Sequence, residues 1–132
     1  MFKAGGIAYI YLCYGIHRLF NVVVSNANNP QAVLIRAIQP ISGIKYMLQR
    51  RKMKKISYHI TSGPGKVSQA LSIKLNHNGD NLQDSRIKIY NTKEPLLKHN
   101  IISSPRIGVS YAGQDALKPW RFRIKGNPWC GP

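Results

Sequence analysis

The sequence predicts a single α/β domain of the α+β type over residues 1–132, with a mostly antiparallel sheet and flanking helices. Short runs rich in β-branched and aromatic residues are separated by turn residues, as strands are. Apolar residues at helical spacing are confined to two short segments. The strand–helix–strand alternation that builds parallel sheets does not occur, so an antiparallel sheet is expected.

The predicted strands are short, and they cover residues 7–12, 19–24, 32–38, 87–90, 106–109 and 121–124. The first two strands flank Tyr14 and Gly15, so we expect a β-hairpin with these residues near its tip. The polar stretches 25–30 and 76–84 are expected to be loops.

Two short helices are predicted from the spacing of apolar residues. The first contains Ile41, Ile44, Met47 and Leu48, and it leads into five cations within residues 50–55. The second contains Val67, Ala70 and Leu71. Ser62 is the predicted N-cap of the second helix, and Pro64 suits its first turn.

The charge balance points to a polyanionic partner. The chain has 20 Lys and Arg residues against four acids, which gives a net charge of +16. Such a field attracts nucleic acid most commonly, although charge alone does not separate nucleic acid from a membrane surface or the ribosome.

Cys13 and Cys130 form no CxxC pair, so no disulfide framework and a reducing, cytoplasmic setting are expected. The four histidines lack metal-ligand spacing, and neither a metal nor another cofactor is predicted. Residues 4–16 are uncharged but too short for a bilayer span of roughly 20 apolar residues. No A-x-A cleavage site follows, so this stretch is interpreted as a buried strand and no membrane partner is expected.

An ordered set of motifs resembles the alkyladenine (3-methyladenine) DNA glycosylase family. Residues 6–16, followed by Asn21, resemble its Y-x-Y-x-x-Y-G-M hairpin, and residues 32–37 resemble its A-V-L-I-R-A strand. Its G-P-G-K helix start is matched by residues 63–66 and 69–71. Residues 106–109, 119–122 and 126–128 complete the order, so the resemblance covers essentially the whole chain.

The resemblance implies a single domain with a curved antiparallel sheet and a hairpin that inserts into DNA. It implies a base-excision repair enzyme that acts as a monomer and hydrolyses the N-glycosyl bond of alkylated or deaminated purines, such as 3-methyladenine. Such an enzyme must flip its target base out of duplex DNA, at a cost of a few kcal/mol. In a bacterium this cytoplasmic protein would associate with the nucleoid.

By resemblance, Tyr14 is the intercalating residue, Tyr11 stacks on the flipped base and Asn21 lies in the base pocket. Arg36 positions the attacking water, which the backbone carbonyl of Ile107 also contacts. Three of these residues have a plainer interpretation. Tyr14 could pack on its own sheet, Asn21 could hydrogen-bond to backbone, and Arg36 could be salt-bridged or snorkelling.

Ile16 and His17 are expected beside the DNA groove, again by resemblance. Lys66 follows Gly-Pro-Gly at the predicted helix start, where a cation and free amides suit a phosphate. The basic run 50–55 is equally well interpreted as a solvated face.

The family's catalytic glutamate lies in an E-T-E-A-Y motif upstream of the hairpin, whereas Met1 here matches an internal M-F just before the hairpin. The resemblance therefore implies an N-terminally truncated chain that lacks this general base and is inactive alone. Its four acids, Asp80, Asp84, Glu94 and Asp115, match no catalytic motif. A non-catalytic basic DNA- or RNA-binding fragment is the alternative function.

Overall fold

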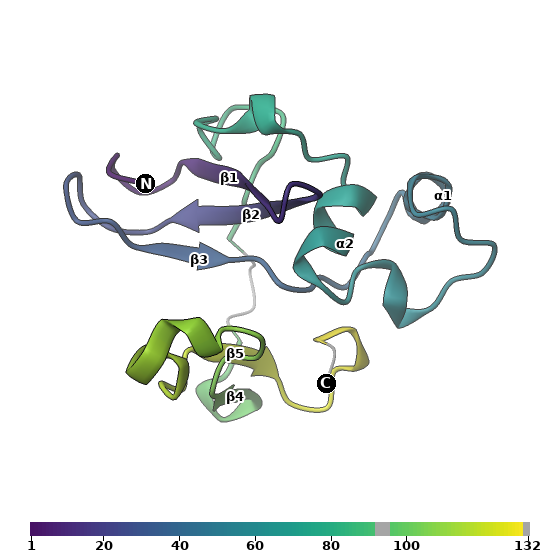
Figure 1. Ribbon diagram of the computed structural model, residues 1–132. Helices are drawn as coiled ribbons and strands as arrows, with labels where there is room; N and C mark the ends of the chain where they lie inside the picture. Colours follow the sequence, from purple (N-terminus) through teal and green to yellow (C-terminus); the bar gives the residue numbers. More distant parts are fainter. Residues whose placement is uncertain (92–95, 131–132) are drawn as a thin grey trace.

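The computed structural model describes residues 1–91 and 96–130. Three antiparallel strands form the larger sheet in the order β1 (Ala8–Cys13), β2 (His17–Val23) and β3 (Ala32–Leu34) (Figure 1). Strand β1 pairs with β2 from Ala8 opposite Val22 to Cys13 opposite His17. The strands predicted over residues 7–12 and 19–24 are confirmed.

A second antiparallel sheet pairs β4 (Ile101–Ser104) with β5 (Arg121–Ile124). The two α-helices are α1 (Ile44–Arg50) and α2 (Pro64–Ala70). The 3₁₀-helices of the described residues are η1 (Tyr58–Ile60), η2 (Leu75–His77), η3 (Lys98–Asn100), η4 (Ser110–Ala116, kinked at Gly113) and η5 (Pro128–Cys130). The predicted α+β class with antiparallel sheets is confirmed.

One face of the larger sheet packs on the first core. Strand alternation places Ala8 and Ile10 on the same face, and both are buried with Phe20, Ile73 and Leu82. In Figure 1 the teal segment that contains η2 lies beyond β1, and the β4–β5 pair lies beyond β3. Tyr9 and Tyr11 alternate with these core residues, so they lie on the opposite face of the sheet.

A smaller core joins the two α-helices to the C-terminal part of the chain. This core contains Met47 of α1, Ile60 of η1 and Ala70 of α2, which are buried together. Trp129 of η5 packs against them. The Trp129 ring also meets the Tyr58 ring edge-on, with centroids 5.1 Å apart. Apolar burial at helical spacing explains why both predicted helices form. Helix α1 begins later than its first predicted apolar position, and α2 begins earlier than its own because proline suits the first turn.

Two helix starts differ in detail from the prediction. Helix α1 begins at Ile44 after Gly43, so Ile41 lies outside it and is 93% exposed. The N-cap of α2 is Gly63 and not Ser62. Gly63 has φ of 152°, which a residue with a Cβ rarely adopts. The predicted position of Pro64 in the first turn is confirmed.

The predicted strand 32–38 ends early, at Leu34. The Ile35 N–H still donates to the Phe20 carbonyl at 3.0 Å, but the chain then leaves β2. Ala37 forms an isolated bridge with Ser62, and the Thr61 hydroxyl donates to the Ile38 carbonyl at 2.7 Å. Hydrogen bonds to the segment before α2 therefore replace the sheet partners.

The strands predicted over residues 87–90 and 106–109 are wrong. Ile87 packs on the first core and the Ile89 N–H donates to the Leu82 carbonyl, so that segment bonds to its own loop. Pro105 lacks an N–H and Gly108 has φ of 73°, so strand geometry ends at Ser104. The strand lies earlier, at β4. No helix in the described ranges is long and apolar enough to cross a bilayer.

Candidate nucleic-acid interface

The turn between β1 and β2, residues 14–16, holds two apolar side chains in solvent. We call it the Tyr14 turn. Tyr14 and Gly15 have left-handed backbone conformations, with φ of 50° and 71°, and the Ile16 N–H donates to the Cys13 carbonyl at 3.2 Å. Tyr14 is 82% exposed and Ile16 is 71% exposed. A tyrosine in this conformation is strained, and its ring is not packed on its own sheet.

Behind this turn lies the tyrosine face, which consists of Tyr9, Tyr11 and Asn21. Tyr9 and Tyr11 are two residues apart on β1, and Tyr9 pairs with Asn21 across the sheet, so all three share one face. The two phenol rings lie 5.5 Å apart at an interplanar angle of 31°. The tyrosine face is opposite the first core.

Tyr11 is half enclosed by other parts of the protein. Burial raises the pKa of its phenol above the ordinary value, and Cys13, Tyr111 and Tyr9 add to this rise. The phenol is therefore neutral at physiological pH. Tyr111 belongs to η4 and is 81% exposed. The sequence reasoning missed Tyr111, because it lies in an irregular segment far along the chain from β1.

Asn21 is 7% exposed and bonds to the backbone of both strands. Its Nδ2 donates to the Tyr9 carbonyl at 3.1 Å and to the Leu19 carbonyl at 3.3 Å. The amide nitrogen therefore has a structural use, as the plainer interpretation proposed. It also fixes the orientation of the side chain on the tyrosine face.

Replacing Asn21 with Ala is expected to lower the free energy of unfolding by about 1–3 kcal/mol, because two carbonyls lose a buried donor. Urea unfolding followed by circular dichroism measures the loss. Asn29→Ala is the matched control, because Asn29 is exposed and a surface substitution typically changes stability by about 0.5 kcal/mol or less. Equal losses in both variants would show that the two bonds do not stabilise the fold.

Arg36 lies half-buried just beyond β3. It is close enough to Arg121 of β5 to contribute to lowering the pKa of that guanidinium. Among residues 1–91 and 96–130 no carboxylate forms an ion pair with Arg36, and the ion pair found there joins Lys118 to Asp115 at 2.7 Å. The plainer interpretation of Arg36 as salt-bridged therefore has no support within the described ranges.

Ile107 lies in the loop between β4 and η4. Its side chain is 57% exposed, and the following Gly108 has φ of 73°. The Arg106 guanidinium donates to the Asp115 carbonyl at 3.0 Å and lies 5.5 Å from the Trp120 ring. These contacts hold the loop against η4, the helix that brings Tyr111 to Tyr11.

The start of α2 lies directly beside the Tyr14 turn. The His17 ring packs on Gly65, where an added Cβ would lie 3.0 Å from the ring Nδ1. Lys66 is the next residue along α2, and its methylene chain lies against Gly63. The fold therefore brings His17 and Lys66, two sequence-predicted contacts, to the same side as Tyr14.

The cations of the basic run 50–55 fall into two groups, one that bonds to α2 and one that is exposed to solvent. Arg50 donates to the Ala70 carbonyl at 2.9 Å, Arg51 donates to Gln69, and Gln69 donates back to the Arg50 carbonyl at 3.0 Å. These bonds tie the end of α1 to α2. Lys52, Lys54 and Lys55 are exposed. Two of the five cations are thus structural, and three lie on a solvated face.

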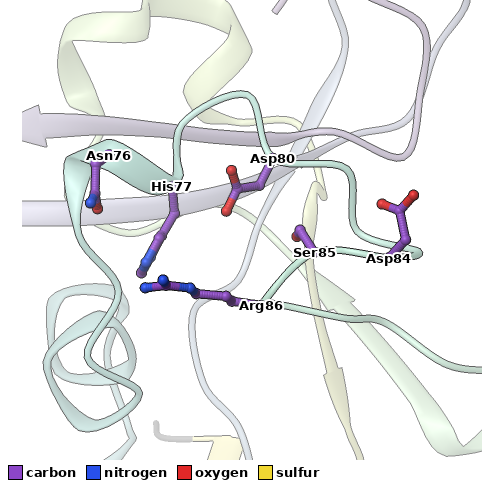
Figure 2. Close-up of a pocket in the computed structure, with 6 residues that line it drawn as sticks. All are labelled: Asn76, His77, Asp80, Asp84, Ser85 and Arg86. Atoms are coloured by element: carbon purple, nitrogen blue, oxygen red, sulfur yellow. The ribbon is translucent and has the colours of Figure 1, made fainter.

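Two of the four acids line a surface hollow of about 550 Å³, with Asn76, His77, Ser85 and Arg86. Figure 2 shows His77 and Arg86 pointing toward one another, with the Asp84 carboxylate at the far side and Asp80 between them. Of the other acids, Asp115 is exposed and paired with Lys118, and Glu94 lies outside the described residues. No group of three potential metal ligands occurs in the part of the chain described.

Comparison with known proteins places these features in context. A family model described as methylpurine-DNA glycosylase matches residues 1–128. The chain is 49% identical to a protein of Chlamydia felis over 94% of its own length. It is 43% identical to a protein of Natranaerobius thermophilus over 98% of its length, and 44% identical to one of Methanocella arvoryzae over 97%. Each carries the name "Putative 3-methyladenine DNA glycosylase". The chain spans 63%, 66% and 63% of their lengths.

Proposed function

The chain belongs to the methylpurine-DNA glycosylase family, and from this membership we propose that it serves in base-excision repair of DNA. The reaction is hydrolysis of the N-glycosyl bond of an alkylated or deaminated purine, such as 3-methyladenine, after the nucleotide is flipped out of the duplex. The protein acts as a monomer, in the cytoplasm and on the nucleoid of a bacterium. The observation that carries the proposal is the exposed Tyr14 ring on a tight turn beside the tyrosine face.

The Tyr14 turn is proposed as the part that enters the duplex. A flipped nucleotide leaves a gap, and an aromatic wedge offsets the unstacking cost by stacking on the neighbouring base pairs. Tyr14 supplies an exposed ring on a turn of three residues, and Ile16 supplies an apolar neighbour. His17 and Lys66 lie at the base of the turn, where they would meet the groove and a phosphate.

The tyrosine face is proposed to receive the flipped base. Alkylated purines such as 3-methyladenine are cationic, and the face of a neutral tyrosine ring attracts a cation by about 0.5–2 kcal/mol. Tyr11 has a phenol whose pKa is raised, so its ring remains neutral. Asn21 is held by two backbone bonds and would offer its amide oxygen to the base edge.

Arg36 and the Ile107 carbonyl are proposed to hold the attacking water. Hydrolysis also requires a base that takes the proton from this water. Asp80 and Asp84 line the hollow beside η2, and Asp115 is bound to Lys118. The chain is therefore assigned DNA binding, base recognition and water positioning.

Duplex DNA binding tests the proposal first. The logarithm of the binding constant should fall by about 0.9 for each phosphate neutralised per decade of salt. Lys66→Ala should reduce this slope by about one unit, because one phosphate contact is lost. Fluorescence anisotropy of a labelled duplex at several salt concentrations gives both slopes.

Lys88→Ala is the matched control for Lys66→Ala, because it removes the same charge from an exposed position. An equal reduction in both variants would assign the effect of Lys66 to net charge alone. An RNA duplex of the same sequence that binds as tightly as DNA would favour a general nucleic-acid-binding function instead.

A further inference from the structure

The smaller sheet presents two arginines and a serine on one of its faces. Ser104 of β4 is paired with Arg121 of β5, and Arg123 lies two residues after Arg121. Cross-strand partners and residues two apart share a face of a sheet. Ser104, Arg121 and Arg123 therefore form one cluster, which we call the β4–β5 arginine cluster.

Polar atoms in this cluster are buried and lack partners. Arg121 is only 8% exposed. The Ser104 Oγ and the Arg123 Nε are both buried without a hydrogen-bond partner among the described residues. Buried polar groups are nearly always hydrogen-bonded, and a donor left without a partner costs about 1–3 kcal/mol. A ligand with acceptor oxygens would supply the missing partners.

A hollow opens beside the cluster. It has a volume of about 310 Å³, and Arg123 lines it together with Ile102, Asn127 and Cys130. A phosphate ion is small enough to enter a hollow of this size, and the hollow is distinct from the one that contains Asp80 and Asp84.

The charge of the cluster is uncompensated in the described ranges. No carboxylate there forms an ion pair with Arg121 or Arg123. Burial lowers the pKa of Arg121, and the nearby positive charges of Arg123 and Arg36 lower it further. Three guanidinium groups that gather without an anion favour an anionic ligand with several oxygen atoms.

We propose that Ser104, Arg121 and Arg123 form a phosphate-binding site, which takes a phosphate group either from a nucleic-acid backbone or free in solution. The guanidinium groups donate charge-assisted hydrogen bonds to the phosphate oxygens, and the Ser104 hydroxyl donates one more. This site lies on β4 and β5, apart from the Tyr14 turn and Lys66.

Isothermal titration calorimetry of the full 132-residue chain with inorganic phosphate, at constant ionic strength set with chloride, tests the site. Arg123→Gln should weaken phosphate binding about tenfold or more, since a hydrogen bond to a charged group is lost. Arg121→Gln should do the same, and Ser104→Ala should weaken binding several-fold. Because Arg121 is buried, circular dichroism must show that its variant folds, while the half-buried Arg123 gives a second, milder test.

Lys125→Gln is the matched control, because it removes one charge from an exposed position at the end of the same strand. Its phosphate affinity should stay within about twofold of the wild type, as expected for a screened surface charge. Absence of phosphate binding by the wild type, or equal weakening by Lys125→Gln and Arg123→Gln, would overturn the proposal.

Duplex DNA titrations distinguish the two sources of the phosphate. If the site takes a backbone phosphate, Arg123→Gln also reduces the salt slope of DNA binding by about one unit. If it takes free phosphate, that slope is unchanged while phosphate binding is lost. Either result supports the site. The proposal would be overturned if Arg123→Gln changed neither the affinity for inorganic phosphate nor the salt slope of DNA binding.

Discussion

The purified 132-residue polypeptide is expected to release no 3-methyladenine or hypoxanthine from a labelled DNA duplex. N-glycosyl hydrolysis needs a carboxylate that accepts a proton from water and offsets the developing positive charge on the sugar. A hydrogen bond from Lys118 and its charge lower the pKa of Asp115, which stays ionised in that ion pair. Asp80 and Asp84 line a separate hollow. A positioned general base typically contributes about 10²–10⁴ in rate.

The control for this assay is a full-length relative whose catalytic carboxylate has been removed, assayed at the same concentration. Turnover above that control would contradict the expectation. In that case single replacements of Asp80, Asp84, Glu94 and Asp115 by the corresponding amides would identify which carboxylate activates the water.

Tyr14→Ala is expected to weaken binding to a duplex containing ethenoadenine or an abasic site, with little change for an undamaged duplex. Stacking of an aromatic ring on a base contributes about 1–3 kcal/mol, which corresponds to roughly 5- to 150-fold in affinity. Binding to undamaged DNA depends on phosphate contacts, and the substitution leaves the net charge unchanged. Fluorescence anisotropy with both duplexes at one salt concentration measures the two effects.

Tyr46→Ala is the matched control, because Tyr46 is also an exposed tyrosine but lies on α1. It should leave both affinities unchanged, and circular dichroism should show that both variants fold. Equal losses on the two duplexes for Tyr14→Ala would indicate a damaged fold. No loss on either would exclude Tyr14 as the intercalating residue.

The parts of the fold that could be predicted from the sequence are those stabilised by local patterns. Strands β1 and β2 consist of β-branched and aromatic residues, and α1 and α2 carry apolar residues at helical spacing. The segment 87–90 has the same composition, yet Ile87 packs on the first core and the backbone bonds to its own loop. Strand β4, whose polar Ser103 and Ser104 mask its pattern, forms because β5 pairs with it.

In the candidate site, too, the residues that could be predicted are those brought together by local structure. Tyr14, Tyr11 and Asn21 are close in sequence, so a single turn and strand alternation suffice to bring them together. The neighbours that the sequence did not indicate come from distant segments. Tyr111 reaches Tyr11 through η4, and Arg121 approaches Arg36 from β5. The path of the chain between distant segments determines these proximities, and no local pattern encodes them.

One comparison of wild-type affinities shows whether the chain recognises a damaged purine within duplex DNA. The measurement is fluorescence anisotropy of the 132-residue chain with two duplexes of one sequence, which differ only in ethenoadenine or adenine at the central position. We expect the ethenoadenine duplex to bind more tightly by at least about fivefold, the lower end expected for one added stacking contact. Equal affinity for the two duplexes would contradict this expectation.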